Sequence, residues 1–266
     1  IASQIRIHSR YGGIVPEIAS RKHIESVVPV ILQALDDASV SLKDIQGIAA
    51  TRGPGLVGSL LVGLSAAKAV AFAGGIPFVG VNHLEGHVAS VFLTEKRPDF
   101  PFVALVVSGG HTNVYQVRNF QDFTILGQTR DDAAGEAFDK AAKLLDIGYP
   151  GGVVIDRMAK EGDPERIAFP RAMKDSPDFS FSGVNASRVV VCGGVAANSR
   201  LREKFFAEGQ SRGFEIFIPP MVLCTDNAAM IAVVGDHLLR RGRRDPLDLN
   251  AVSRWPLDSQ PAGSRC

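Results

Sequence analysis

The sequence predicts a globular protein of the α/β class, and three observations favour this class. The chain has 266 residues, of which 45% are hydrophobic and 27 are glycine, a composition typical of a mixed fold. Residues 45–81 read as strand, glycine loop, helix and strand, which is a βαβ unit. Further strand-length apolar runs alternate with amphipathic segments along the rest of the chain. A chain of this length can bury one large core or two lobes.

Each expected element has a signal in the sequence. A helix over 16–38 carries apolar residues at helical spacing, although Pro29 should kink or divide it. A buried strand over 45–51 leads through a glycine loop into a helix that ends near residues 74–75. The later elements are expected as strand 78–81, helix from 83, strands 102–107 and 113–117, helix 131–146, a short helix containing Asp156, strand 188–192, helix 199–210, strand 214–218 and a last helix from 224–227.

Charge and cysteine content narrow the possible partners and compartment. With 29 basic and 28 acidic residues, no overall field indicates nucleic acid or a membrane. The three cysteines lack C-x-x-C spacing, which suits a reducing cytoplasm. No membrane partner is expected, because Gly63, Ser65 and Lys68 interrupt the longest apolar run. The first residue is Ile and no signal peptide is visible, so the beginning of the protein is expected to be absent.

The most informative stretch is V-G-V-N-H-L-E-G-H, over residues 79–87, a short strand that turns directly into a helix. His83 and His87 lie on one face of that helix, so both rings can reach one metal ion. The other interpretation is a pair of surface or core histidines. Glu85 lies roughly on the opposite side, so this is not the H-E-x-x-H arrangement, and Asn82 with Glu85 fits a capping pair.

Three glycine turns after residue 102 predict a nucleotide site. They are S-G-G-H-T at 108–112, Y-P-G-G at 149–152 and G-G-V-A-A-N at 193–198. Backbone N–H groups at such turns can hold phosphates, while carboxylates and amides hold ribose and base. The alternative is plain turns without a ligand. Asp139, on the helix between the first two turns, fits equally well as part of an ion pair with Lys143 on a solvated face.

A fourth glycine loop is the main competing signal. Gly53, Gly55 and Gly58 satisfy G-x-G-x-x-G between a strand and a helix, as in dinucleotide-binding proteins. The match is incomplete, because the next strand ends in Val81-Asn82 and offers no acid for a ribose. An NAD-dependent oxidoreductase is therefore an alternative. Close approach of the backbone to another element or a ligand explains the glycines better.

The last helix begins at C-T-D-N, with Thr225 as its expected N-cap and Asp226 in its first turn, where the helix dipole favours an acid. Asp226 is also a carboxylate at the end of an element. The helix closes with four arginines that either satisfy its C-terminus or bind nucleic-acid phosphates: Arg240, Arg241, Arg243 and Arg244.

Taken together and in order, nine motifs resemble the bacterial TsaD family. They are Y-G-G-I-V-P-E (11–17), G-P-G-L-V-G-S-L-L-V-G (53–63), H-L-E-G-H (83–87), V-S-G-G-H-T (107–112), D-D-A-A-G-E-A-F-D-K (131–140), Y-P-G-G (149–152), F-S-F-S-G (179–183), G-G-V-A-A-N (193–198) and C-T-D-N-A-A-M-I-A (224–232). The resemblance covers nearly the whole chain.

The resemblance implies a two-lobed fold of the actin, Hsp70 and sugar-kinase type, with ribonuclease-H-like mixed sheets and a cleft between the lobes. The first lobe would comprise residues 1–101, rejoined by 230–266, and the second, adenylate-binding lobe residues 102–229. The implied activity is transfer of threonylcarbamoyl from threonylcarbamoyl-AMP to the exocyclic amine of the tRNA adenosine just 3′ of the anticodon. The implied partners are a same-fold TsaB-like protein and a TsaE-like ATPase, in the cytoplasm.

Carried over by motif, the metal ligands would be His83, His87 and Asp226, holding one Fe(II) or Zn ion that assists the transfer. The implied adenylate-binding residues are Val106, Val107, Ser108, Gly109, Gly110, Asp139, Gly152, Asp156 and Asn198. The resemblance gives no catalytic residue beyond the metal site.

Two departures from the family pattern leave alternatives open. The strand and loop of the type G-I-E-T-S-C-D are absent before Ile1, so one phosphate loop is expected to be missing. Between F-S-F-S-G and the strand at Arg188 only four residues stand in for several dozen. A non-catalytic same-fold partner or a truncated remnant therefore remains an alternative, and the isolated chain is expected to be a poor enzyme.

Overall fold

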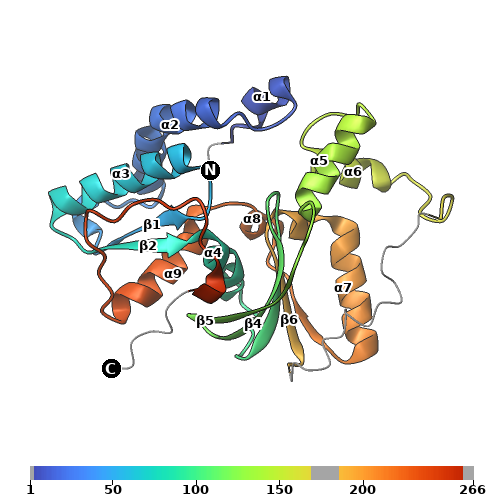
Figure 1. The fold of residues 1–266 in the computed structure, drawn as a ribbon. Coiled ribbons are helices and arrows are strands. Elements are labelled where there is room, and N and C mark those ends of the chain that lie inside the picture. The colour runs from blue at the N-terminus through green and yellow to red at the C-terminus, as the bar shows by residue number, and fades with distance from the viewer. Residues whose placement is uncertain (1–2, 169–185, 260–266) are drawn as a thin grey trace.

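Two separate β-sheets organise the protein, each covered by helices (Figure 1). The structure is a computed structural model and describes residues 3–168 and 186–259. The smaller sheet pairs β1 (Ile48–Gly53) with β2 (Phe78–Asn82) in parallel. The larger sheet has the strand order β5-β4-β3-β6-β7. This mixed α/β architecture confirms the fold class expected from the sequence.

Helices cover both faces of the smaller sheet because successive residues of a strand point to opposite faces. Phe78 packs with residues of α3 (Val57–Gly74), whereas the next residue, Val79, packs with α9 (Ala228–Arg240). Helix α2 (Pro16–Asp37) lies on the outer side of α3 (Figure 1). The βαβ unit expected from the sequence is therefore present, with α3 as its crossover.

The larger sheet combines an antiparallel meander with two parallel strands. Its strands are β3 (Phe102–Val107), β4 (Thr112–Asn119), β5 (Asp122–Gln128), β6 (Arg188–Cys192) and β7 (Glu215–Phe217). Its helices are α5 (Ala134–Leu144), α6 (Gly151–Ala159) and α7 (Ser199–Arg212). Helix α7 lies beside the β6–β7 edge, and α5 and α6 form a separate pair above the sheet (Figure 1).

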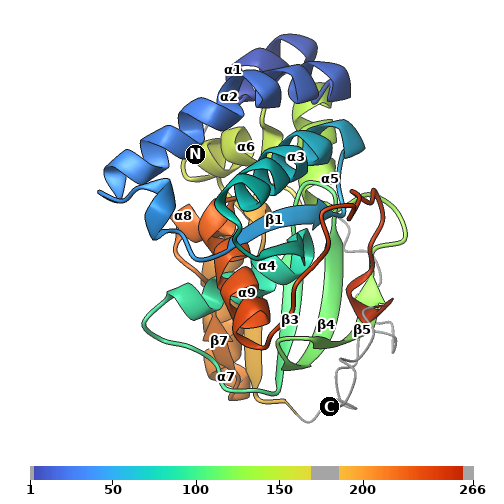
Figure 2. The same ribbon diagram turned by 90° about the vertical axis from the view of Figure 1, so that its left-hand side faces the viewer.

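The short helix α4 (His83–Ala89) joins the two halves, and only His83 in it is not buried. Leu84 and Val88 belong to a core cluster with strands of the larger sheet, while Ala89 packs with α9. Figure 2, turned by 90°, shows α4 behind α9 and beside β3. Because α4 is held from both sides, the side chains on its free face are fixed relative to both sheets.

Several expected boundaries differ from the structure. Helix α2 runs through Pro29 without division. Strand β5, which the sequence did not indicate, extends the hairpin to a meander. The last helix starts at Ala228, and its cap is Asn227, whose side chain accepts a hydrogen bond from the Met230 N–H, so the expected cap at Thr225 is wrong.

One expectation about apolar segments needs correction. Helix α3 is long and apolar enough to cross a membrane by length and composition, despite its interruptions. This is a weak indication, because α3 packs against β1 and α2, and Lys68 within it donates a hydrogen bond to the Leu249 carbonyl. In this structure α3 covers one face of the smaller sheet.

Candidate metal centre and adenylate wall

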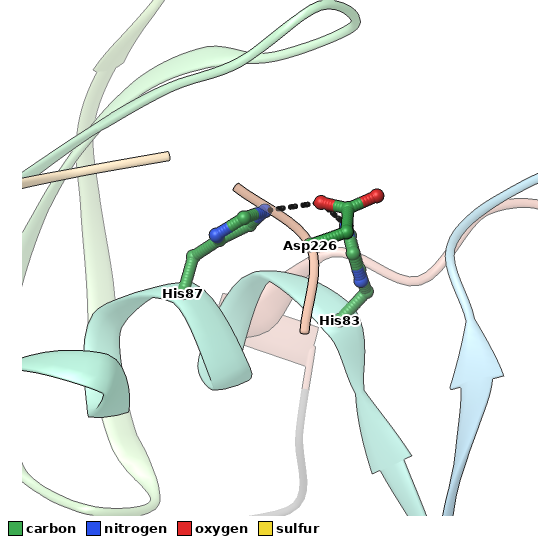
Figure 3. Close-up of side chains that lie close together, drawn as sticks. All are labelled: His83, His87 and Asp226. Atoms are coloured by element: carbon green, nitrogen blue, oxygen red, sulfur yellow. Dashed lines mark ion pairs between the residues drawn. The ribbon is translucent and has the colours of Figure 1, made fainter. Parts of the chain in front are cut away.

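Three side chains converge at the start of α4 (Figure 3). The Nε2 atoms of His83 and His87 lie 3.3 and 3.2 Å from the same carboxylate oxygen, Oδ1 of Asp226. Their candidate ligand atoms all lie within 4.8 Å of one another. The structure therefore brings together the three residues that the sequence motifs suggested as metal ligands.

The strand-to-helix turn before His83 is held by the C-terminal part of the chain. The Asn82 side chain accepts a hydrogen bond from the Leu84 N–H at 2.9 Å and donates one to the Trp255 carbonyl at 2.9 Å. The Asp245 carboxylate accepts a bond from the Gly80 N–H at 2.8 Å. The sequence gave no signal for these contacts, because their partners lie more than 160 residues further along the chain.

Asp226 reaches the histidines because α9 approaches α4 closely at Gly86. A Cβ at Gly86 would lie 2.8 Å from the Ile231 Cδ1 atom and 3.3 Å from the Met230 Cγ atom. The glycine therefore allows the start of α9 to contact α4, and with it the segment between α8 (Met221–Cys224) and α9. Asp226 lies in that segment, before the Asn227 cap, so its carboxylate does not serve as the helix cap.

The donor set fits a divalent ion. Two imidazoles and one carboxylate are ligands of zinc and iron, and ligand atoms at about 2.0–2.2 Å from one ion lie roughly 3.0–3.5 Å apart. The measured separations of 3.2 and 3.3 Å fall in this range. His87 is fully buried; its Nε2 faces the Asp226 carboxylate at 3.2 Å, and its Nδ1 has no hydrogen-bond partner among the described residues. A buried ring nitrogen without a partner is costly unless something binds it.

The charge state of Asp226 also suits a ligand. Burial raises the pKa of Asp226, but hydrogen bonds and charges from His83 and His87 outweigh this effect and hold the pKa well below its ordinary value. The side chain keeps 77% of its surface exposed, so the ionised carboxylate is open to solvent.

Glu85 lies away from the three ligands, as its position in the helix predicted. Its side chain is buried beside Val88, Phe92, Phe100 and Phe120. Burial raises the pKa of Glu85 to about 8, and the charge of Arg243 only partly opposes this. The expected capping pair is only half correct: Asn82 caps the helix, but Oε1 of Glu85 has no hydrogen-bond partner among the described residues.

Close backbone contacts bring the three glycine turns together at one end of the larger sheet. A Cβ at Gly135, in the first turn of α5, would lie 2.7 Å from the Gly109 Cα atom. A Cβ at Gly151 would lie 2.7 Å from the Asp139 Cα atom. Gly193, with φ of +96°, lies against the Val107 carbonyl, so a side chain there would be strained and blocked. The glycines are therefore required by packing between the turns.

Open space adjoins the same turns. A Cβ at Gly109, Gly110 or Gly194 would meet no atom within 4 Å. The hairpin tip is held by two hydrogen bonds between Ser108 and His111, at 2.8 and 3.1 Å. Backbone amides in such open, fixed turns can hold an anion. The structure thus has a preformed wall with no side chain over these glycines.

The polar side chains expected at this wall each use one oxygen to accept hydrogen bonds from within the protein. Asp139 accepts from the Gly151 N–H at 2.7 Å, and Asn198 caps α7 by accepting from the Leu201 N–H at 2.9 Å. Asp156 accepts from Ser199, which the sequence analysis missed because the bond spans 43 residues. Val106 and Val107 are buried core residues of β3, so their backbone is what they can offer a ligand.

The three candidate metal ligands and the glycine wall are neighbours. Helix α8, which precedes Asp226, packs on the short helix at Gly194–Ala197. Arg202 joins these segments by donating to the Ala196 and Pro219 carbonyls at 3.1 and 2.9 Å. Burial lowers the pKa of His111, and the nearby His83 and His87 lower it further, so the hairpin tip also lies close to the ligands. His111 was missing from the expected site residues, although it belongs to the S-G-G-H-T turn.

The loop that resembled a dinucleotide fingerprint is explained by packing. Gly53 lies against the backbone of Val252, and a Cβ at Gly58 would lie 2.5 Å from the Ser20 Oγ atom. The absence of a side chain at both positions therefore lets other parts of the chain approach closely, as the sequence analysis expected. Nothing in this loop points to a nicotinamide cofactor.

Comparisons with known proteins agree on one family. The sequence profile of TsaD, tRNA N6-adenosine threonylcarbamoyltransferase, matches residues 1–187 and 184–233. A protein of that name from Syntrophus aciditrophicus is 61% identical, covering 97% of this chain and 90% of its own length. Another from Geobacter metallireducens is 50% identical with the same coverage.

These alignments also locate the internal segment in which this chain departs from the family pattern. The first runs over 304 positions, more than the 266 residues of this chain, so the relative has segments without a counterpart here. The two profile matches meet at residues 184–187, where the sequence analysis expected the gap. Part of this junction lies outside the described residues.

Among solved structures, HypF in its phosphate- and nucleotide-bound form shares the fold, with 12% identity, a TM-score of 0.54 and coverage of 79% of this chain and 41% of that chain. That likeness concerns the fold alone. The profile match over most of the chain and the high identity to curated relatives decide the family: this chain belongs to the TsaD family of tRNA N6-adenosine threonylcarbamoyltransferases.

Proposed function

We propose that this chain transfers a threonylcarbamoyl group from threonylcarbamoyl-AMP to the exocyclic amine of the tRNA adenosine just 3′ of the anticodon. The observation that carries the proposal is the convergence of His83, His87 and Asp226 beside the glycine wall. A divalent ion site next to an anion-binding wall suits a substrate that joins a carbamoyl carbonyl to a phosphate.

Each part of the site has a role in the proposal. His83, His87 and Asp226 would hold one Fe(II) or Zn ion, which when bound supplies Lewis-acid polarisation and orientation. The amides of Gly109 and Gly110 and the hydroxyl of Ser108 would hold the phosphate, because the Ser108 N–H already donates to the His111 carbonyl. The free oxygen of Asp139 and that of Asp156 would accept from ribose hydroxyls, with Gly152 and the Asn198 amide beside them.

The transfer itself is an acyl substitution. The adenosine N6 atom forms a bond to the carbamoyl carbon, the bond from that carbon to the phosphate oxygen breaks, and AMP leaves with the electron pair while the amine loses a proton. The chain's contribution is to hold both reactants at short range and to stabilise the leaving phosphate. No side chain is assigned as general base.

The architecture suggests how the work is divided. We propose residues 1–101 with 230–266 as the first lobe and 102–229 as the second, so that the metal ligands come from both. A TsaB-like same-fold protein is the proposed partner, and its contact is the exposed apolar stripe of Ile24, Val28 and Leu32 on α2, at helical spacing. A TsaE-like ATPase and a cytoplasmic location, where tRNA resides, complete the proposal.

The test is a transfer assay with labelled threonylcarbamoyl-AMP and a tRNA transcript, with the proposed partners present. Labelled tRNA is expected with wild-type protein, and none with a transcript in which guanosine replaces the target adenosine. His83→Ala serves as the metal-site control. Absence of product with wild type, under conditions in which a complete relative is active, would contradict the proposal and favour a non-catalytic role.

A further inference from the structure

The Y-G-G motif lies in a segment to which the proposed chemistry gives no role. We call residues 5–13 the N-terminal arm; it comprises α1 (Ile5–His8), the short helix Ser9–Tyr11 and Gly12-Gly13. In both views the arm lies at the same end of the molecule as α5 and α6 (Figures 1 and 2). These helices carry Asp139 and Asp156, so the arm borders the side of the protein that bears the adenylate wall.

The arm presents an aromatic ring and two free positive charges. Tyr11 is 61% exposed. Arg6 and Arg10 are also exposed, and neither guanidinium makes an ion pair or hydrogen bond within the described part of the chain. No acidic residue occurs before Glu17. The arm is thus a local basic patch in a chain of nearly neutral charge.

The arm is fixed from beneath, so these groups are held in place. His8 is buried; its Nδ1 accepts from the Val15 N–H at 3.3 Å, and its Nε2 lies 3.2 Å from Oε1 of Gln4. Gln4 in turn contacts His23 on α2 at 3.0 Å. Gly12 ends the short helix Ser9–Tyr11 with φ of +66°, and a Cβ at Gly12 would meet nothing within 4 Å. The space beside Tyr11 is therefore open.

We propose that the N-terminal arm binds single-stranded nucleotides of the anticodon loop, with Tyr11 stacking on a base and Arg6 and Arg10 contacting phosphates. An exposed aromatic ring on the same short segment as two unpaired arginines is the combination that binds single-stranded nucleic acid. The inference rests on the proposed function, and it names the surface that receives the tRNA. It goes beyond the metal and adenylate residues, none of which belongs to the arm.

The other basic cluster is less available. Arg240 pairs with Asp236 at 2.7 Å, and Arg243 pairs with Asp245 at 3.2 Å. Arg244 donates to the Leu239 and Arg243 carbonyls at the end of α9. These three arginines satisfy the helix end and neighbouring acids, as the structural interpretation of the cluster predicts, whereas Arg241 makes no ion pair within the described part of the chain.

The experiment measures binding of an anticodon stem-loop RNA to the whole chain by fluorescence anisotropy over a series of salt concentrations. Tyr11→Ala should weaken binding roughly 5- to 150-fold, the range for loss of one base–aromatic stack, whereas Tyr11→Trp should retain it. Arg6→Gln and Arg10→Gln should each reduce the salt slope by about 0.7. Matched controls are Phe72→Ala, an aromatic ring 77% exposed near the end of α3, and Arg200→Gln, paired with Glu203 on α7.

The outcomes separate the inference from the proposed function. His83→Ala should bind the RNA like wild type while losing transfer. Wild-type binding that Tyr11→Ala and both arginine variants leave unchanged would overturn the arm proposal alone and favour a protein contact there. Failure of the wild type to bind this RNA, with the target adenosine in place, would contradict the proposed function as well.

Discussion

The Oδ1 atom of Asp156 accepts hydrogen bonds from both the N–H and the hydroxyl of Ser199, at 2.7 and 2.8 Å, and thereby ties α6 to the start of α7. Both bonds end on one oxygen. The carboxylate therefore stabilises the fold and still has Oδ2 available for a ligand.

Replacing Asp156 should reduce stability as well as ligand binding. Asp156→Ala leaves two donors at the start of α7 without their acceptor, so the free energy of unfolding should fall by about 1–3 kcal/mol. Ser199→Ala removes the hydroxyl bond alone and should cost about 0.5–1.5 kcal/mol. Urea denaturation of the three proteins measures both. Equal stability of wild type and Asp156→Ala would show that the carboxylate is not engaged in this way.

Asp226→Asn tests the third metal ligand. The structure places Asp226 before the helix cap, so the substitution should cost little stability, while loss of the negative charge should lower metal occupancy markedly. Elemental analysis after dialysis gives metal per chain. His83→Ala is the positive control. Occupancy equal to wild type in Asp226→Asn, with His83→Ala depleted, would remove Asp226 from the ligand set.

Gly86→Ala tests the close approach that brings Asp226 to the histidines. The new Cβ would lie 2.8 Å from the Ile231 Cδ1 atom, so overpacking should cost about 1–3 kcal/mol and reduce metal occupancy. Shortening the neighbour with Ile231→Val should restore part of both losses, since it removes the contacting methyl group. Thermal unfolding and metal analysis of the single and double variants check this. No recovery in the double variant would mean that α4 and α9 are not coupled through this contact.

Asp139→Ala should weaken binding of a non-hydrolysable adenylate analogue and leave metal content unchanged. The residue contacts Gly151 in the wall and none of the metal ligands. Glu136→Ala on the same helix is the matched control, because Glu136 pairs with the exposed Lys140 on the surface of α5. Isothermal titration gives the affinities. Unchanged affinity in Asp139→Ala would assign this carboxylate to the turn at Gly151 and to no ligand.

The apolar stripe on α2 provides a test of partner dependence. Val28→Asp places a charge at a position that is 57% exposed in the free chain, so folding and metal content should persist. If a same-fold protein covers the stripe, the charge should abolish its stimulation of transfer. Leu144→Asp, at an 88% exposed position on α5, should retain the stimulation. Equal stimulation in both variants would place the partner elsewhere.

Local patterns in the sequence determined most elements and two of the three candidate metal ligands. The β2–α4 turn and the common face of His83 and His87 follow from helix periodicity, which acts within a few residues. The glycine turns were likewise visible as turns. Their proposed roles and the third candidate ligand, Asp226, came from the resemblance to the TsaD family, because no local rule connects residues so far apart in the chain.

Only the tertiary structure decided how these parts meet. It showed that Asp226 precedes the helix cap, which moved to Asn227, and that Gly86 admits α9 against α4. It also showed that Glu85 lies in an aromatic core and that Ser199 holds Asp156. Strand β5 could not be predicted either, because its pairing with β4 supplies the stabilisation that its own residues do not signal. Such contacts depend on packing between distant segments, and the sequence encodes them only through the fold as a whole.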